Sequence, residues 1–320
     1  MGKLGLIVTL CIIAIITVSN PLTEQYLMKL RSDAAVVSKQ QDALYEMIES
    51  KAPEFEQPVY DAKIDPVWKS VPGYNGLQVD IKKSYDKMKP KGKFLKDKLV
   101  YKEIKPKVHL SDLPPAAIYR GHPEKPIVSF IINVAWGNEY LSDMLATLKK
   151  HNVLATFFLE GHWVKENPDL AKMIVEAGHE VGNHSFSHPN MKELPAAAVK
   201  EEIEKTNAVI EATTGKRIKW FAPPSGYYRE EVVKIAAAMK LGTIMWSVDT
   251  IDWKKPTPDQ LINRVMSKVH NGAFILMHPT ESTEKALDQL ILQIKNQGLE
   301  LGTVSDNLSE DRIMLKNMKK

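Results

Sequence analysis

The chain has 320 residues, of which 44% are hydrophobic and 26% are charged, and its formal net charge is +4 at pH 7. This composition excludes an intrinsically disordered protein and allows one large core plus a smaller unit. Lys and Arg residues are spread along the chain rather than gathered in one stripe, which argues against a nucleic-acid partner.

The chain begins with an apolar segment that is typical of a membrane anchor or a secretory signal. Lys3 precedes a run without charge from Leu4 to Thr23. A short positive region followed by such a run directs a chain to or across a membrane. Its length is close to the roughly 20 residues of an average span, and we favour an uncleaved anchor over cleavage after Ser19. We therefore expect an extracytoplasmic protein, membrane-anchored or secreted, with residues 1–23 as signal anchor or signal peptide.

The only cysteine of the sequence, Cys11, lies inside this apolar run. Because Cys11 follows Leu10 in mid-run, it does not resemble a lipoprotein cysteine, which normally ends such a run. Neither disulfides nor thiol catalysis is available to the exported part of the chain.

Residues 24–125 are expected to form a helical stalk, a small α+β region and a linker. Between Glu24 and Ile48, apolar residues recur at loose helical spacing with charged residues between them, which predicts a helix. From Pro53 to Lys125, prolines surround short strand-like segments such as Gly76–Ile81. No chemical motif in this region indicates a function.

From Pro126 onward, strand-like and helix-like stretches alternate. The expected strands are 127–132, 154–159, 180–183, 218–221, 242–246, 273–277 and 300–304. The expected helices are 139–151, 168–177, 195–213, 229–239, 258–269 and 283–296. Strands that alternate with helices of this length predict an α/β fold with a parallel sheet and right-handed crossovers. Seven such units over residues 126–308 favour a barrel related to the TIM type over a doubly wound sheet, and residues 309–320 remain as a tail.

Unusual side chains follow several of these expected strands. In either parallel architecture, ligands bind at the carboxyl ends of the strands. The residues that follow successive strands at this edge are Asn133, His184, His188, Pro223, Pro224, Asp249, Asp252 and His278. We therefore expect them on one face of the sheet.

Two histidines form the sharpest of these patterns. His184 and His188 are four residues apart just beyond a strand, so a helical turn can direct both rings toward one point, where ring nitrogens bind a metal such as zinc. A pair of surface histidines is the alternative, and the position at a strand end favours the metal site.

A third histidine, His278, ends a buried strand. It is either a hydrogen-bonded core residue or a general acid, and Asp249 at a neighbouring strand end is placed to bond its ring and raise its pKa. Trp136, Trp246 and Trp253 lie near the same face, where they form either a floor for sugar rings or part of the core.

Five segments together resemble the polysaccharide deacetylase (NodB-homology) family. They are ATFFLEG (155–161), GHEVGNHSFSHP (178–189), FAPPSG (221–226), WSVDTIDW (246–253) and ILMH (275–278). The match extends from about Pro126 to Leu308, and the chain looks similar to the YlxY-type branch of Gram-positive spore formers. The resemblance implies a distorted (β/α)7 barrel that removes N- or O-acetyl groups from chitin-like or peptidoglycan sugars. It also implies a divalent metal, zinc or cobalt, held by one Asp and two His.

The same resemblance implies a role for each matching residue. His184 and His188 match the two metal-ligand histidines. His278 matches the general acid, and Asp249 matches the carboxylate that orients it. The residues that match the walls of the sugar groove are Pro224, Trp253 and Leu276.

Three positions depart from the family pattern. The family's Asp-Asp pair is replaced by Asn133 at the catalytic-base position and by Val134 at the third metal-ligand position. Ala222 stands where an Arg usually pairs with the base. An amide has no basic lone pair near neutral pH, and valine offers a metal nothing. Weak or absent metal binding and impaired catalysis are therefore expected.

Two functions follow as expectations. The first is a polysaccharide deacetylase-like protein that hydrolyses the acetamide C–N bond of N-acetylated cell-wall glycans, with Glu160 or Glu139 as a substitute base if activity persists. The second is a non-catalytic glycan-binding or scaffold protein that uses the same groove. In both cases the expected partners are a cell-wall polysaccharide, either peptidoglycan or a chitin-like glycan, and a membrane through the N-terminal segment.

Overall fold

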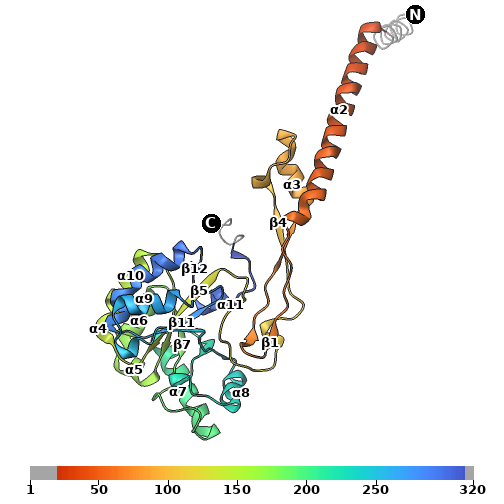
Figure 1. Ribbon diagram of the computed structural model, residues 1–320. Helices are drawn as coiled ribbons and strands as arrows, with labels where there is room; N and C mark the ends of the chain where they lie inside the picture. The colour runs from red at the N-terminus through yellow and green to blue at the C-terminus, as the bar shows by residue number, and fades with distance from the viewer. Residues whose placement is uncertain (1–19, 314–320) are drawn as a thin grey trace, which may run out of the picture. The chain divides into compact units, whose positions relative to one another are not determined.

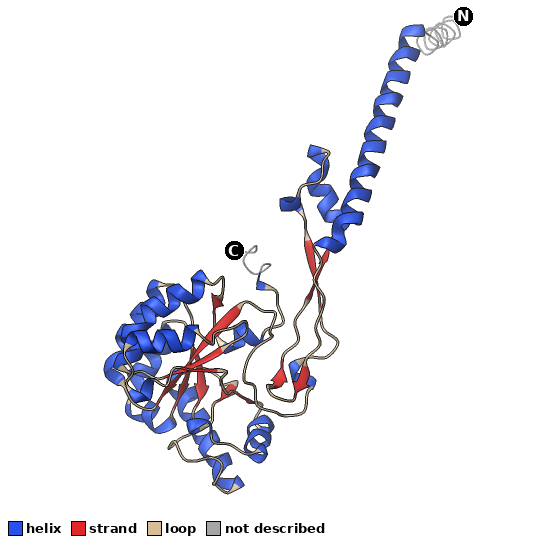
Figure 2. Ribbon diagram, in the orientation of Figure 1, coloured by secondary structure: helices blue, strands red, loops and turns tan. Residues whose placement is uncertain are grey.

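The computed structural model describes residues 20–313 (Figure 1; Figure 2). The chain divides into two compact units, one made of Met1–Pro58 and Leu77–Ile104 and the other of Val59–Gly76 and Lys105–Lys320. This division differs from the expected boundary near residue 125. The expected α+β region and linker are shared between the two units.

The expected membrane segment, residues 1–23, lies almost entirely outside the described residues, which begin at Asn20. Within residues 20–313, no helix is both long enough and apolar enough to cross a bilayer. The helix expected between Glu24 and Ile48 is confirmed as α2 (Pro21–Lys51). Its start is well defined, because the Asn20 side chain accepts a hydrogen bond from the Leu22 amide and Pro21 occupies the first turn.

The smaller unit packs the C-terminal part of α2 against a short helix and a strand pair. Helix α3 (Ile81–Met88) begins at Asp80, whose side chain accepts a hydrogen bond from the Lys83 amide. Strand β3 (Gly76–Val79) pairs with β4 (Tyr101–Ile104). The buried apolar residues of this core are Leu44, Ile48, Ala52, Val79, Met88 and Leu99.

The larger unit is an α/β domain with a curved sheet, preceded by a small antiparallel pair of β1 (Lys63–Asp65) and β2 (Lys69–Val71). Its parallel strands are β5 (Ile127–Val134), β6 (Thr156–Leu159), β7 (Glu180–Asn183), β8 (Trp220–Phe221), β9 (Gly242–Thr243), β10 (Val248–Asp249), β11 (Phe274–Met277) and β12 (Glu300–Leu301). Its helices are α4 (Asn138–Lys150), α5 (Gly161–Glu166), α6 (Pro168–Glu176), α7 (Ala196–Thr214), α8 (Glu230–Ala238), α9 (Pro258–Met266), α10 (Glu281–Asn296) and α11 (Val304–Leu308). Short 3-10 turns include η5 (Pro224–Gly226) and η6 (Asp252–Lys254).

The sheet has the strand order β10-β11-β5-β6-β7-β8-β9, with β12 paired to the start of β5. Its two ends, β9 and β10, are consecutive in the chain and separated only by residues 244–247. The sheet therefore curves back on itself without a described strand pairing between β9 and β10. The predicted parallel α/β fold is confirmed, whereas the closed barrel is only partly formed.

Ile118, from the segment expected to be a linker, lies at this open seam. Its amide donates to the Thr243 carbonyl, and its carbonyl accepts from the Met245 amide. These two bonds form the bridge between Ile118 and Ile244, so residues near 118 act as part of the sheet. This explains why residues 105–125 belong to the larger unit.

Successive side chains of β5 point to opposite sides of the sheet and so belong to two different layers of the core. Phe130, Ile132 and Val134 belong to the large cluster between the sheet and the helices. Ile131 belongs to the inner cluster with residues of the other strands, including Phe158. Helices α4, α6, α9 and α10 cover the outer side of the strands (Figure 1). Asn133 shares the inner side with Ile131, and this places it at the mouth of the curved sheet.

Candidate functional site

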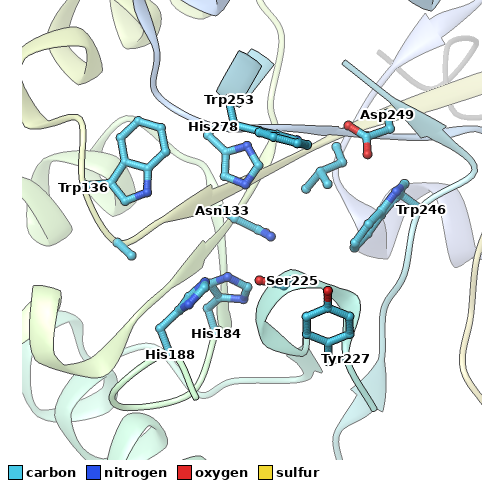
Figure 3. Close-up of a pocket in the computed structure, with 12 residues that line it drawn as sticks. Asn133, Trp136, His184, His188, Ser225, Tyr227, Trp246, Asp249, Trp253 and His278 are labelled. Carbon is cyan, nitrogen blue, oxygen red and sulfur yellow. The ribbon is translucent and has the colours of Figure 1, made fainter. Parts of the chain in front are cut away.

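A cavity of about 450 Å³ opens where β5, β7, β10 and β11 end. Figure 3 shows its side chains converging from different strand ends. The lining residues are Asn133, Ala135, Trp136, His184, His188, Ser225, Tyr227, Trp246, Asp249, Trp253, Leu276 and His278. The structure thus brings together most of the residues that the sequence placed at this edge.

Asn133 and Val134 point to opposite sides of β5. Asn133 lines the cavity, is 5% exposed, and its Oδ1 has no hydrogen-bond partner among the described residues. Val134 is fully buried in the cluster beneath the helices and does not line the cavity. The position that the family uses for a metal-ligand carboxylate is therefore filled here by a core side chain.

The two expected metal-ligand histidines lie side by side, with ring centroids 5.0 Å apart. His184 Nδ1 is 2.8 Å from the Ala222 carbonyl oxygen, which only accepts, so Nδ1 carries the hydrogen and Nε2 keeps its lone pair. Burial, with His188 nearby, lowers the pKa of His184 to about 3, and burial also lowers the pKa of His188. Both rings are therefore neutral near pH 7.

Residues 184–188 are held in place from two directions. The Asn183 side chain accepts a hydrogen bond from the Ser185 amide. Glu202 of α7 accepts from the amides of Phe186 and Ser187 and from the Ser187 hydroxyl. These bonds allow Ser185 and His188 to adopt positive φ angles of 62° and 55°, which turn the loop tightly enough to bring both rings together.

The side chains present do not fit a catalytic zinc or cobalt ion. Among the described residues, no group of three or more His, Cys, Asp or Glu side chains is placed to hold a metal. The His184–His188 pair supplies two neutral nitrogens, whereas zinc sites normally have at least three protein ligands. Val134 adds no donor. Ala222, at 2% exposure in the inner core, leaves no cation opposite Asn133.

The carboxylate that orients His278 is Asp252, and the expectation that Asp249 has this role is wrong. His278 Nδ1 lies 2.8 Å from Asp252 Oδ1, and the His278 amide donates to Asp252 Oδ2 at 2.6 Å. The Thr283 hydroxyl also donates to Asp252 Oδ2, at 2.8 Å. Asp252 is fully buried at the start of η6. Asp249 instead accepts from the Ile251 amide and faces the cavity beside Trp246 (Figure 3).

Neither alternative base lies in the cavity lining. Glu160 caps α5, where its Oε2 accepts a hydrogen bond from the Trp163 amide at 2.7 Å, and burial raises its pKa. Glu139 is exposed in the first turn of α4. The structure therefore brings no carboxylate to the place where Asn133 stands.

Aromatic side chains surround the mouth of the cavity. Trp136, Tyr227 and Trp253 are 48%, 54% and 56% exposed. The Trp136 ring stacks on His278 with centroids 5.9 Å apart and an interplanar angle of 8°. Of the expected wall residues, Trp253 and Leu276 line the cavity, whereas Pro224 is buried in η5 outside the lining.

Ser225 and Tyr227 line the cavity but were not predicted from the sequence as site residues. Both belong to the loop that follows β8, and Ser225 has φ 54°. Gly226, with φ 71°, allows Trp246 to approach, since a Cβ there would lie 2.6 Å from the Trp246 ring. The signal was available in the sequence, because Ser225 belongs to the motif FAPPSG at a strand end and Tyr227 directly follows that motif.

Buried histidines predict a marked acid sensitivity of the fold. Burial lowers the pKa of His122 and His179 to about 4 and that of His184 to about 3. Unfolded histidines titrate near pH 6.5, so below that pH the unfolded state binds more protons. The free energy of unfolding should therefore fall as the pH is lowered from about 6.5 to about 4, by up to about 1.4 kcal/mol per pH unit for each ring.

Urea unfolding at pH 7 and pH 5 measures this dependence. His179→Gln should reduce the pH dependence, because the His179 ring is buried and its Nδ1 accepts a hydrogen bond from the Ala155 amide. His162→Gln, which changes an exposed ring on α5, is the matched control for the loss of a histidine. Equal stability of the wild type at both pH values would contradict the prediction.

Comparisons with known proteins agree with this geometry. The family model described as "Polysaccharide deacetylase" matches residues 120–244. The uncharacterized protein YlxY of Bacillus subtilis is 54% identical over 295 residues, which are 92% of each chain. The peptidoglycan-N-acetylmuramic acid deacetylase PdaA of the same organism is 31% identical over 207 residues, covering 63% of this chain and 79% of PdaA.

The crystal structure of BA3943 from Bacillus anthracis, described as a CE4 family pseudoenzyme, superposes with a TM-score of 0.81 at 56% identity. The match covers 84% of this chain and 96% of that chain. A BA3943 mutant described as having restored enzymatic activity superposes equally well, at 55% identity. The motifs, the curved parallel sheet and the relatives all indicate the same family. The chain therefore belongs to the polysaccharide deacetylase family.

Proposed function

We propose that this chain is a polysaccharide deacetylase-like protein that binds N-acetylated cell-wall glycans in the cavity but has lost most or all hydrolysis of the acetamide C–N bond. The observation that carries this proposal is the pair Asn133 and Val134. An amide whose oxygen has no partner among the described residues stands at the base position, and a core valine stands at the third ligand position. The similar BA3943 is described as a pseudoenzyme, which supports the same reading for this chain.

The retained residues suit binding more than catalysis. Asp252 holds the orientation of the His278 ring through Nδ1, which leaves the second ring nitrogen for a ligand. Without a base near Asn133, a bound water has no group that takes its proton. We therefore assign His278 to positioning of a bound sugar in the present site.

The exposed aromatic residues support a glycan as the ligand. Large exposed apolar side chains that gather around a cavity mark a binding surface, and Trp136, Tyr227 and Trp253 are each about half exposed. Aromatic rings combine apolar contact area with a polar edge, which suits the apolar faces and hydroxyl rims of sugars. Relatives of this chain are named as peptidoglycan deacetylases, so peptidoglycan is the proposed glycan, with chitin-like oligomers as its simplest analogues.

Calorimetric titration of the full chain with chito-oligomers, together with an acetate-release assay under added zinc, tests this function. We expect measurable binding and little or no acetate. Trp253→Ala should weaken binding at least several-fold, since about 100 Å² of lost apolar contact corresponds to roughly 2 kcal/mol. Leu292→Ala, an exposed change on α10 outside the cavity, is the control. Efficient acetate release by the wild type, or no binding at all, would overturn the proposal.

We further infer an extracytoplasmic location, membrane-anchored or secreted, from the apolar run Leu4–Val18 and from the relatives that act on peptidoglycan. The proposed anchor would keep the cavity on the wall side of the membrane. Protease treatment of intact protoplasts should digest residues 24–320, and protection of that part would refute the location.

A further inference from the structure

The floor of the cavity presents hydrogen-bond acceptors that have no donor partner among the described residues. His184 Nδ1 is bonded to the Ala222 carbonyl, so Nε2 remains as an acceptor. His188 lies against it and also lines the cavity. Asn133 Oδ1 has no hydrogen-bond partner among the described residues, and a flip of the side-chain amide would turn this oxygen toward a ligand.

The charge of the cavity lining is negative. Asp249 lines the cavity with its carboxylate, and none of the described lining residues is Lys or Arg. Ala222 supplies no guanidinium near Asn133. Asp252 lies behind His278 and is fully buried, with its hydrogen bonds directed to His278 and Thr283. A ligand in this cavity therefore meets acceptors and one carboxylate without a compensating protein cation.

In an active family member, a divalent cation would bind such acceptors and offset the negative charge. The described side chains of this chain do not fit a divalent cation. A positively charged ligand in the same place would bind the acceptors and offset the charge instead. A protonated primary amine carries one positive charge and three N–H donors, which match the two imidazole nitrogens and the amide oxygen of the floor.

We propose that the floor binds the ammonium group of a de-N-acetylated amino sugar, so that the protein recognises a glucosamine unit, the product of the family reaction, within a cell-wall glycan. This rests on the proposed function, that glycans bind in this cavity. It adds a preference for the free amine over the acetamide. Asp249 is the main source of that preference, because its carboxylate lines the cavity and pairs with an ammonium group but not with a neutral acetamide.

A cation beside Trp253 argues against binding of the amine on that ring. Lys254 Nζ lies 5.0 Å from the centroid of the Trp253 ring and would repel an ammonium placed on that ring. We therefore assign the amine to the interior of the cavity that His184, Asn133 and Asp249 line, and assign the apolar face of the sugar ring to Trp253.

The test compares a glucosamine tetramer with the N-acetylglucosamine tetramer of equal length, by calorimetric titration of the full chain at a pH where the amine is protonated. We expect the glucosamine tetramer to bind at least tenfold more tightly, with an affinity that falls as salt is added. Asp249→Asn keeps an oxygen for the Ile251 amide and removes the charge, so it should reduce glucosamine affinity about tenfold and leave N-acetylglucosamine affinity unchanged.

Two further variants separate the possible results. Asn133→Leu should weaken the glucosamine tetramer more than the acetylated one, whereas Trp253→Ala should weaken both alike. Equal or tighter binding of the acetylated tetramer overturns the amine preference and leaves glycan binding intact. If neither tetramer binds while circular dichroism shows a folded chain, glycan binding itself fails.

Discussion

Changing Asn133→Asp, Val134→Asp and Ala222→Arg together is expected to confer zinc-dependent release of acetate from N-acetylated oligomers. Val134→Asp returns a carboxylate to the family's third ligand position. Because Val134 now packs beneath the helices, the end of β5 has to turn toward the cavity before this carboxylate joins the His184–His188 pair, and one coordination position then remains for water. Asn133→Asp supplies the base, and Ala222→Arg holds it by a charge-assisted hydrogen bond and keeps it ionised. General-base catalysis is typically worth about 10²–10⁴-fold, so the gain over the wild type should be large.

Each step of this rebuilding has its own measurement. Val134→Asp alone should bind zinc by calorimetric titration but release little acetate. Because Val134 is fully buried in the core, the same variant should unfold more easily than the wild type without zinc and recover with it. A triple variant that binds zinc yet stays inert would show that the groove rejects the family's substrate. If the wild type released acetate as fast as the triple variant, its site would be catalytically competent as it stands.

Asp252→Ala is expected to destabilise the larger unit by about 3 kcal/mol or more. The substitution removes the acceptor of the His278 amide, of His278 Nδ1 and of the Thr283 hydroxyl. Asp252 is fully buried, so water does not readily replace these bonds. The change should appear as a lower urea midpoint, and glycan binding should also weaken because the His278 ring loses its fixed orientation.

Asp249→Ala is the matched control for this variant. Asp249 lies three residues earlier, is partly exposed, and has one recorded hydrogen bond, from the Ile251 amide. We expect its effect on the urea midpoint to be under half that of Asp252→Ala. Equal destabilisation by the two variants would contradict the assignment of Asp252 as the partner of His278.

Most strands and helices of the larger unit were predictable because its sequence alternates at the spacing of β/α units. Expected and observed bounds agree within a few residues for β5, β7, β11, α4 and α7. The short strand β10 was not predicted, since two residues leave no periodic pattern. The partner of β9 at the open seam, Ile118, was also not predictable, because its segment is rich in proline and reads as a linker.

Most residues of the site could be predicted from the sequence, but the carboxylate that bonds His278 could not. The motif WSVDTIDW offers two carboxylates three residues apart, and spacing alone does not say which one turns toward His278. The answer depends on Ile251, which adopts φ 53° and sends the chain into η6. A positive φ at a β-branched residue is rare and is not readable from sequence. By contrast, the period of two along β5 already implied that Asn133 and Val134 face opposite sides.

The burial of Val134 makes a return to catalysis difficult by single steps. An aspartate at 134 alone places a carboxylate in an apolar cluster, and an arginine at 222 alone places a guanidinium where the present residue is 2% exposed. Each charge becomes tolerable only after its partner, ion or opposite charge is present. A route to hydrolysis that begins with either of these two changes is therefore expected to pass through variants that fold less well than the present protein.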